Sequence, residues 1–234
     1  MKCTLQIFFL LIASCVLHPY GGVGQIVTDT TKEIVSLKLE QEKKFRYFRV
    51  GADISKWLAS LVQNNYKEIE FAGDVLYKRN LFLAMELGTG NSRVQNEFLQ
   101  YKSSNTFIRL GIDKTFFAKE HARDMDNAFV GFRYAFAPIV RKEAIFTMKD
   151  PIWGNNTGTI APESFIAHWM ELTGGFRLEV IPNIFVGWNI RVRTFLNPSR
   201  FEKLAPFHVA GYGSGEKATA FGYNFYILKG FGKR

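Results

Sequence analysis

Hydrophobic and polar residues alternate strictly in eight segments of the chain. In 184–196, one parity carries Ile184, Val186 and Trp188, whereas the other carries Arg191 and Arg193. Alternation with a period of two predicts a β-strand with two different faces. The eight segments are 48–54, 68–77, 80–88, 107–113, 128–137, 170–180, 184–196 and 221–227.

The connections between these segments differ in length. Only Lys78 and Arg79 separate the second segment from the third, and 181–183 separates the sixth from the seventh. Three other connections are long, polar and rich in Gly, Ser, Asn and Pro: 89–106, 138–165 and 197–218. An even number of strands, short turns at one end and long loops at the other are typical of barrels that span the outer membrane. We therefore predict an all-β fold, an eight-stranded antiparallel up-and-down transmembrane β-barrel.

The alternative to a membrane barrel is a soluble lipocalin-type barrel or sandwich, whose strands also alternate. A soluble fold would turn the apolar parity inward and the charges outward. Here the apolar parity is almost free of charge in all eight segments, which favours lipid outside. We expect aromatic residues in the girdles at the membrane interfaces, among them Tyr77, Phe136, Trp169, Trp188 and Phe231.

The polar parity then faces a lumen that is narrow in an eight-stranded barrel. Unpaired charges would be very costly there, so acids and bases are expected to pair in a network that closes the bore. Inward glycines at 51, 111, 131, 175, 187 and 222 leave room for the long side chains. A narrow channel or a small-ligand barrel is the alternative. The predicted network consists of Arg49, Asp53, Glu68, Glu70, Asp74, Glu86, Arg109, Asp113, Arg133, Glu171, Arg177, Glu179, Arg191 and Arg193.

The N-terminal segment has the properties of an export signal. Lys2 precedes an apolar stretch at 7–17, and small residues at 21–24 offer a cleavage site before Gln25. We predict a signal peptide over 1–24, a periplasmic arm over 25–44 and a barrel over 45–234, in the outer membrane of a Gram-negative bacterium. The alternative is a lipoprotein leader in which Cys15 is lipidated. Both cysteines of the chain lie in this segment, so no disulfide is expected in the mature protein.

The chain is basic, with a formal net charge of +9. No run of Lys and Arg exceeds two residues, so we expect no nucleic acid as partner. For an exported chain, the expected partners are anionic outer-membrane lipid and the phosphates of lipopolysaccharide.

The last alternating segment resembles the signal that the outer-membrane barrel-insertion machinery reads. Gly222, Phe225 and Ile227 match the glycine and the two hydrophobic positions of that signal. Ala220 departs from its polar start, and the chain continues after it. The resemblance implies that the insertion machinery is a partner.

More of the chain resembles a small uncharacterised outer-membrane β-barrel family of the Bacteroidetes, a domain of unknown function. The matching stretches are "RVGADISKW" (49–57), "NLFLAMELG" (80–88), "FIRLGID" (107–113), "VGFRYAFA" (130–137), "WMELTGGFRLEVIPNIFVGWNIR" (169–191), "AGYG" (210–213) and "FGYNFYI" (221–227). The resemblance covers most of the mature chain and implies the barrel fold, but no reaction.

Catalytic chemistry has one candidate pair. Ser164 and His168 share the outward parity at the start of the sixth segment, as a lipid-A-modifying hydrolase at the membrane rim would need. No acid of matching parity lies nearby, so we expect no enzyme. His121 and His208 lie in separate loops without metal-ligand spacing, and we predict neither a metal nor a cofactor.

The long loops carry the remaining functional candidates. Five aromatic residues there stand beside Lys and Arg, a composition that is enriched in protein interfaces: Phe146, Trp153, Phe201, Phe207 and Tyr212. The alternative is that the loops pack on themselves as a cap. The sequence thus favours a non-enzymatic barrel, a structural or accessory subunit that docks a surface lipoprotein or another barrel, for example in an outer-membrane assembly complex.

Overall fold

A computed structural model describes residues 47–63, 65–78, 80–116, 125–150, 152, 154–197 and 204–232. The predicted signal peptide and periplasmic arm lie outside these residues. The elements are β1 (Tyr47–Asp53), α3 (Ile54–Val62), β2 (Tyr66–Lys78), β3 (Leu81–Gln95), β4 (Leu99–Thr115), β5 (Asn127–Arg141), β6 (Ala144–Asp150), β7 (Gly154–Ile160), β8 (Glu163–Ile181), β9 (Ile184–Phe195) and β10 (Thr219–Gly232).

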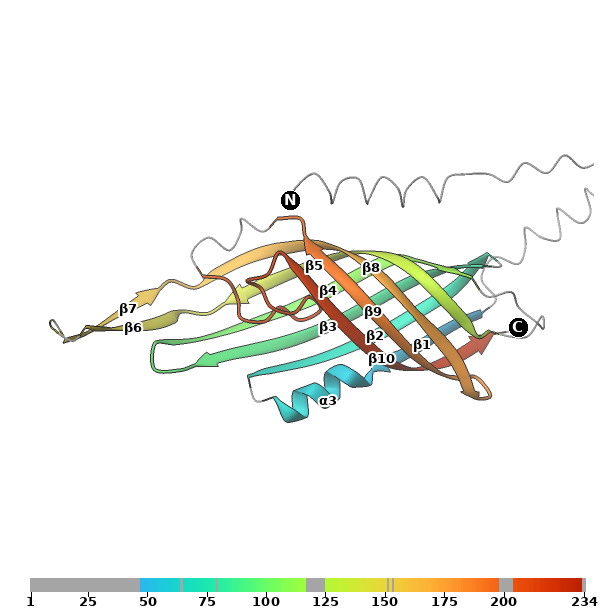
Figure 1. Ribbon diagram of the computed structural model, residues 1–234, viewed down its shortest axis with the longest axis horizontal. Helices are drawn as coiled ribbons and strands as arrows, with labels where there is room; N and C mark the ends of the chain where they lie inside the picture. Colours follow the sequence, from blue (N-terminus) through green and yellow to red (C-terminus); the bar gives the residue numbers. More distant parts are fainter. Residues whose placement is uncertain are drawn as a thin grey trace, which may run out of the picture. The chain divides into compact units, whose positions relative to one another are not determined.

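Eight of the ten strands form a closed antiparallel barrel. The order around the ring is β1, β2, β3, β4, β5, β8, β9 and β10, and β10 pairs with β1 to complete it. Figure 1 shows these tilted strands, with β6 and β7 as a hairpin outside the ring. The predicted fold class is confirmed. Each of the eight alternating segments lies in one strand of the barrel wall, to within one residue at its ends.

The two faces of each strand differ as the alternation predicts. On β5, the outward side chains of Val130, Phe132 and Tyr134 are exposed, whereas Arg133 and Ala135 are buried. The outward positions of neighbouring strands line up in register, for example Phe71, Leu87, Ile108 and Phe136. Such rows form an apolar belt around the barrel, as lipid-facing strands require.

The two ends of the barrel differ. One end, which we call the turn end, carries Tyr47, where β1 begins, and Gly232, where β10 ends. It also carries the tight β8–β9 turn, in which Asn183 adopts a positive φ of 63°. The opposite end, which we call the loop end, carries α3, the β6–β7 hairpin and the β9–β10 connection. In the described part of the chain, no helix is long and apolar enough to cross a membrane.

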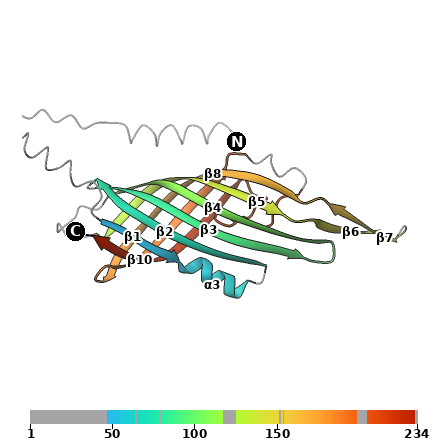
Figure 2. The ribbon, with the colours of Figure 1, turned by 180° about the vertical axis from the view of Figure 1, so that it is seen from behind.

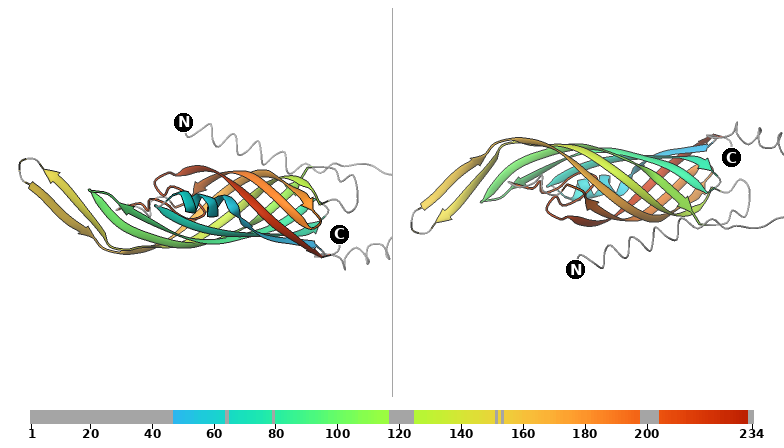
Figure 3. Two further views of the ribbon diagram at one scale, coloured as in Figure 1. Left: turned by 90° about the horizontal axis from the view of Figure 1, so that it is seen from below. Right: turned by 90° about the horizontal axis from the view of Figure 1, so that it is seen from above.

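Two of the predicted long loops are largely β-structure. Most of 89–106 belongs to β3 and β4, which continue in register up to the pair Gln95↔Gln100. Within 138–165, β6 and β7 pair over seven positions. Figure 3 shows that this hairpin extends beyond the barrel, past the end of the β3–β4 hairpin. Backbone pairing therefore continues well past the apolar belt at the loop end.

Strand β1 is short, and α3 follows it directly. The ladder between β1 and β10 ends at the pair Asp53↔Tyr226, and the ladder between β1 and β2 ends at Ala52↔Phe71. Nearer the loop end, β10 and β2 therefore face each other across a seam without a β1 residue between them. Helix α3 runs beside β2 and β10 there, as Figure 2 shows. Asp53 is the N-cap of α3 and accepts hydrogen bonds from the Ser55 and Lys56 N–H groups, which explains why the strand changes to a helix at this residue.

Candidate functional site

The centre of the lumen is a cluster of buried ion pairs. Arg191 forms two parallel contacts with Glu86, at 2.6 and 2.9 Å, and a third with Glu171 at 2.9 Å. Arg109 reaches Glu70 at 2.5 Å, Glu86 at 2.9 Å and Glu171 at 3.4 Å. Each carboxylate thus meets at least one guanidinium in bonding geometry, which is what stabilises charges away from water.

Aromatic donors complete this central cluster. The Tyr226 hydroxyl donates to Glu70 at 2.7 Å and accepts from Arg191 at 2.6 Å. The Trp169 indole N–H donates to Glu171 at 2.6 Å. Trp169 is fully buried, so its prediction as a residue of the interfacial girdle is wrong. The indole faces inward because it has the same parity as Glu171.

A second group of ion pairs lies closer to the turn end. Asp113 contacts Arg133 at 2.7 Å and Arg177 at 2.6 Å, and Asp74 contacts Arg49 at 2.8 Å. The side chains are tightly packed: a Cβ at Gly131 would lie 2.0 Å from the Asp113 Oδ1. A side chain at 131 would therefore displace the Asp113 carboxylate, as the sequence predicts for an inward glycine. Gly187 differs, since the atom nearest to a Cβ there is the Arg177 Cγ at 3.4 Å.

Thirteen of the fourteen predicted lumen residues are buried, and the exception is Glu179. Its side chain is half-buried beside the β8–β9 turn and accepts a hydrogen bond from the Asn183 N–H. Conversely, the predicted network lacks Arg141, because the alternating segment ends at 137. It is buried and contacts Glu163 at 3.1 Å. The buried charged residues that the structure describes are therefore seven acids and seven arginines, a balanced set.

The loop end of the lumen is filled by part of the β9–β10 connection, residues 204–218, which we call the plug. Val209, Ala210 and Tyr212 of the plug are buried. The Tyr212 ring stacks on Phe195 at 3.6 Å between centroids and meets Trp169 edge-on at 5.6 Å. The prediction of Tyr212 as an exposed interface residue is therefore wrong, since the loop folds inward instead of outward.

Polar contacts fasten the plug to the wall. Asn105 bonds reciprocally to the backbone of Ala210, at 3.0 and 2.9 Å. Glu68 accepts from the Gly211 N–H at 2.8 Å and contacts the His208 Nε2 at 3.0 Å. Arg193 donates to the Tyr212 carbonyl oxygen at 2.8 Å. Two charged residues of the predicted network, Glu68 and Arg193, therefore hold the plug.

Burial also affects ionisation of the plug. Removal from water raises the pKa of the Tyr212 hydroxyl to about 12. This hydroxyl therefore stays neutral at physiological pH and donates to the Lys217 carbonyl oxygen at 2.7 Å.

The other predicted interface aromatics have different positions. Phe207 is exposed, and Phe146 is half-buried on the β6–β7 hairpin. Trp153 and Phe201 lie outside the described residues. Of the insertion-signal residues, Phe225 and Ile227 point outward on β10. The third, Gly222, faces Arg193, whose guanidinium lies 2.8 Å from where a Cβ would stand.

The candidate hydrolase pair lies on the outer wall of β8. Ser164 is exposed opposite Val140, and His168 is opposite Phe136. The Nδ1 of His168 is hydrogen-bonded to the Tyr134 hydroxyl at 2.8 Å. The described residues contain no group of three or more His, Cys, Asp and Glu side chains that could hold a metal ion.

A closed ring with an apolar outer belt and a charged, filled lumen defines this protein as a transmembrane β-barrel. The chain matches the Domain of unknown function DUF6048 over residues 2–229, and it belongs to that family. Among curated proteins, none matches. Among solved structures, it is similar to Ail, the attachment invasion locus protein of Yersinia pestis, with 6% sequence identity and a TM-score of 0.41. The similarity covers 80% of this chain and 99% of the Ail chain.

Proposed function

We propose that this protein is a non-enzymatic barrel of the outer membrane that docks another protein of the cell envelope at its loop end. It is exported through the N-terminal leader of a Gram-negative bacterium, a member of the Bacteroidetes, and inserted by the barrel machinery. The single observation that supports docking is the β6–β7 hairpin, which projects from a barrel whose lumen is already filled (Figure 1).

The hairpin has the surface of a binding element. Among the described residues, β6 pairs with the barrel through Leu99↔Phe146 and Gln100↔Ile145, and the Thr147 N–H donates to the Phe98 carbonyl oxygen at 2.9 Å. β7 is the last strand of the sheet order, so its outer edge offers unpaired backbone groups. Edge strands of this kind accept a strand from another chain. Ile152 at the tip is 82% exposed, and Met148 is also exposed, which adds apolar contact area for a partner.

The filled lumen supports docking over transport. The ion pairs occupy the middle of the bore, and the plug occupies its loop end. A channel requires a continuous path for a solute through the lumen, whereas a docking subunit does not. The partner class that fits best is a surface lipoprotein or another barrel, because both are available on the same side of the membrane.

Affinity purification of the full chain in mild detergent tests this proposal. We expect a second envelope protein to be recovered in a stable ratio. Replacing 145–159 by a short turn should abolish that recovery, because it removes the proposed docking element. The barrel itself should stay folded, since β5 and β8 pair directly with each other. The matched control is Ser164→Ala with His168→Ala, which changes the outer wall but leaves the hairpin intact.

Two results would contradict the proposal. One is equal recovery of the partner with and without the hairpin. The other is recovery of the barrel alone, together with altered lipid A in cells lacking the protein that the Ser164→Ala, His168→Ala variant fails to restore. That second result would identify a hydrolase instead.

A further inference from the structure

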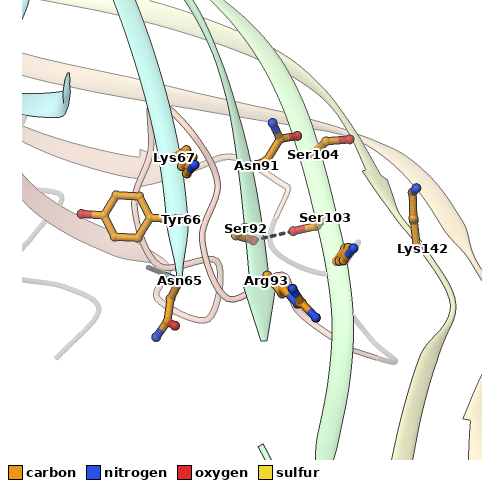
Figure 4. Close-up of a pocket in the computed structure, with 10 residues that line it drawn as sticks. Asn65, Tyr66, Lys67, Asn91, Ser92, Arg93, Ser103, Ser104 and Lys142 are labelled. Atoms are coloured by element: carbon orange, nitrogen blue, oxygen red, sulfur yellow. Dashed lines mark hydrogen bonds between the residues drawn. The ribbon is translucent and has the colours of Figure 1, made fainter. Parts of the chain in front are cut away.

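A surface pocket of about 550 Å³ lies on the barrel wall at the loop end. It extends over the ends of four adjacent strands, β2 to β5, and Figure 4 shows its lining side chains along them. The lining residues are Asn65, Tyr66, Lys67, Asn91, Ser92, Arg93, Lys102, Ser103, Ser104 and Lys142. Four of these ten residues are cationic, and acidic residues are absent from the lining.

Register places the cations on the lipid-facing side of the wall. Lys67 pairs with Asn91, which pairs with Ser104, so these three form one outward row. The next row joins Arg93 to Lys102, and Lys142 continues it through its N–H bond to the Lys102 carbonyl oxygen. All these side chains are exposed, so the cations of β2, β3 and β4 and of the residue that follows β5 share one outer surface.

These cations differ from the arginines of the lumen in having no acidic partner. In the parts of the chain that the structure describes, no ion pair within 4 Å involves Lys67, Arg93, Lys102 or Lys142. The nearby Glu97 is bonded to Lys149 at 2.5 Å instead. The pocket therefore holds an uncompensated positive charge, which attracts an anion.

The pocket lies just above the apolar belt. Between the belt row of Phe71 and Leu87 and the cationic rows stands one row with Ile69, Thr89 and Thr106. At 3.3–3.4 Å per residue, Lys67 lies about 13 Å along β2 from Phe71. The surface thus changes from apolar to weakly polar to cationic over the distance that separates acyl chains from headgroups.

We propose that this pocket binds the phosphate groups of an anionic lipid in the leaflet around the loop end. Lysine and arginine supply the charge, and the Ser104 hydroxyl and the Asn91 amide add hydrogen-bond donors. The belt row of Phe71 and Leu87, beyond the row of Ile69 and the two threonines, receives the acyl chains of the same molecule. A lipid with two phosphates matches the two cationic rows. This site requires only that the barrel spans a membrane and is independent of any protein partner.

Native mass spectrometry of the detergent-solubilised full chain tests the site. The probes are bisphosphorylated lipid A, phosphatidylcholine and inorganic phosphate. We compare the unchanged protein with two triple variants that each remove three exposed lysines. One is Lys67→Gln, Lys102→Gln, Lys142→Gln, at the pocket. The control is Lys78→Gln, Lys114→Gln, Lys229→Gln, at the turn end, where the side chains are also exposed.

We expect lipid A, but not phosphatidylcholine, to bind the unchanged protein. The pocket variant should bind lipid A at least 10-fold more weakly, since each cation near an anionic surface contributes about five-fold to affinity. The turn-end control should stay within two-fold. Equal losses in both variants would overturn the site, because the effect would then come from net charge alone. Displacement of lipid A by equimolar inorganic phosphate would also overturn it, since the pocket would then be a site for soluble anions.

Discussion

Two parts of the lumen close the bore by different means. In the middle, strand residues such as Arg109, Glu86 and Arg191 pair as ions. At the loop end, the plug packs Tyr212 against Phe195 and Trp169. The ionic part belongs to the wall itself, so it forms whenever the strands pair in register. The plug is a separate segment that must find its place afterwards, and its removal need not disturb the wall.

The largest expected effect is on the ionic part. Glu86→Ala removes the two parallel contacts of Arg191 with this carboxylate. It also removes one ion pair each from Arg109 and Arg133. Breaking a buried ion pair from one side costs about 3–5 kcal/mol. Urea unfolding in detergent, followed by the heat-modifiable mobility of the barrel on gels, measures this loss. The control Glu97→Ala removes an exposed pair and should change the unfolding free energy by less than about 1 kcal/mol. Equal effects of both variants would show that the lumen charges are hydrated and weakly coupled.

A smaller effect on the whole protein is expected from the plug. Tyr212→Ala removes a buried ring and should destabilise the plug locally by about 3 kcal/mol, without lowering the unfolding free energy of the barrel by the same amount. Hydrogen exchange at Gly211 and Tyr212 measures the local opening, and the urea transition measures the barrel. If both fell together, the plug and the wall would form one cooperative unit and the distinction would fail.

The smallest expected effect concerns conductance. We predict no steady single-channel current through the unchanged protein in planar bilayers. We also predict none after 205–217 is replaced by a Gly/Ser linker of equal length, because the ion pairs still fill the middle of a narrow bore. Adding Glu86→Ala and Arg191→Ala to the linker variant provides the control, since it empties part of that middle. Ion-selective openings in the linker variant alone would assign closure to the plug.

The strands and their inward charges could be predicted because the barrel repeats one rule along every segment. Parity alone assigns Arg109, Glu171 and Arg191 to the lumen, and it also assigns Asn224, which is buried. Arg141 follows the same rule, but it lies beyond the point at which the apolar alternation becomes weak. The fold was therefore predictable wherever the outer face is strongly apolar.

The extension of β3 could not be predicted from its composition. Gly90 and Ser92 lie in the predicted loop 89–106, yet they are inward residues of a strand. Their small size has a cause in the tertiary structure, because a Cβ at Gly90 would lie 2.6 Å from the Ala210 Cβ of the plug. The inward side chains of β3 are therefore small where the plug packs against this strand. That relation joins residues about 120 positions apart, and no local pattern encodes it.

The short β1 makes the barrel unevenly fastened around its circumference. At the turn end, backbone bonds join the first and last strands over seven residue pairs. At the loop end, side chains take over: Asp53 accepts from the Phe225 N–H, and Ser60 bonds to the N–H and the carbonyl oxygen of Glu68. These are individual bonds in place of a continuous ladder. If the barrel opens laterally, β1 and β10 are therefore expected to separate first beside α3, and the separation to proceed toward the turn end.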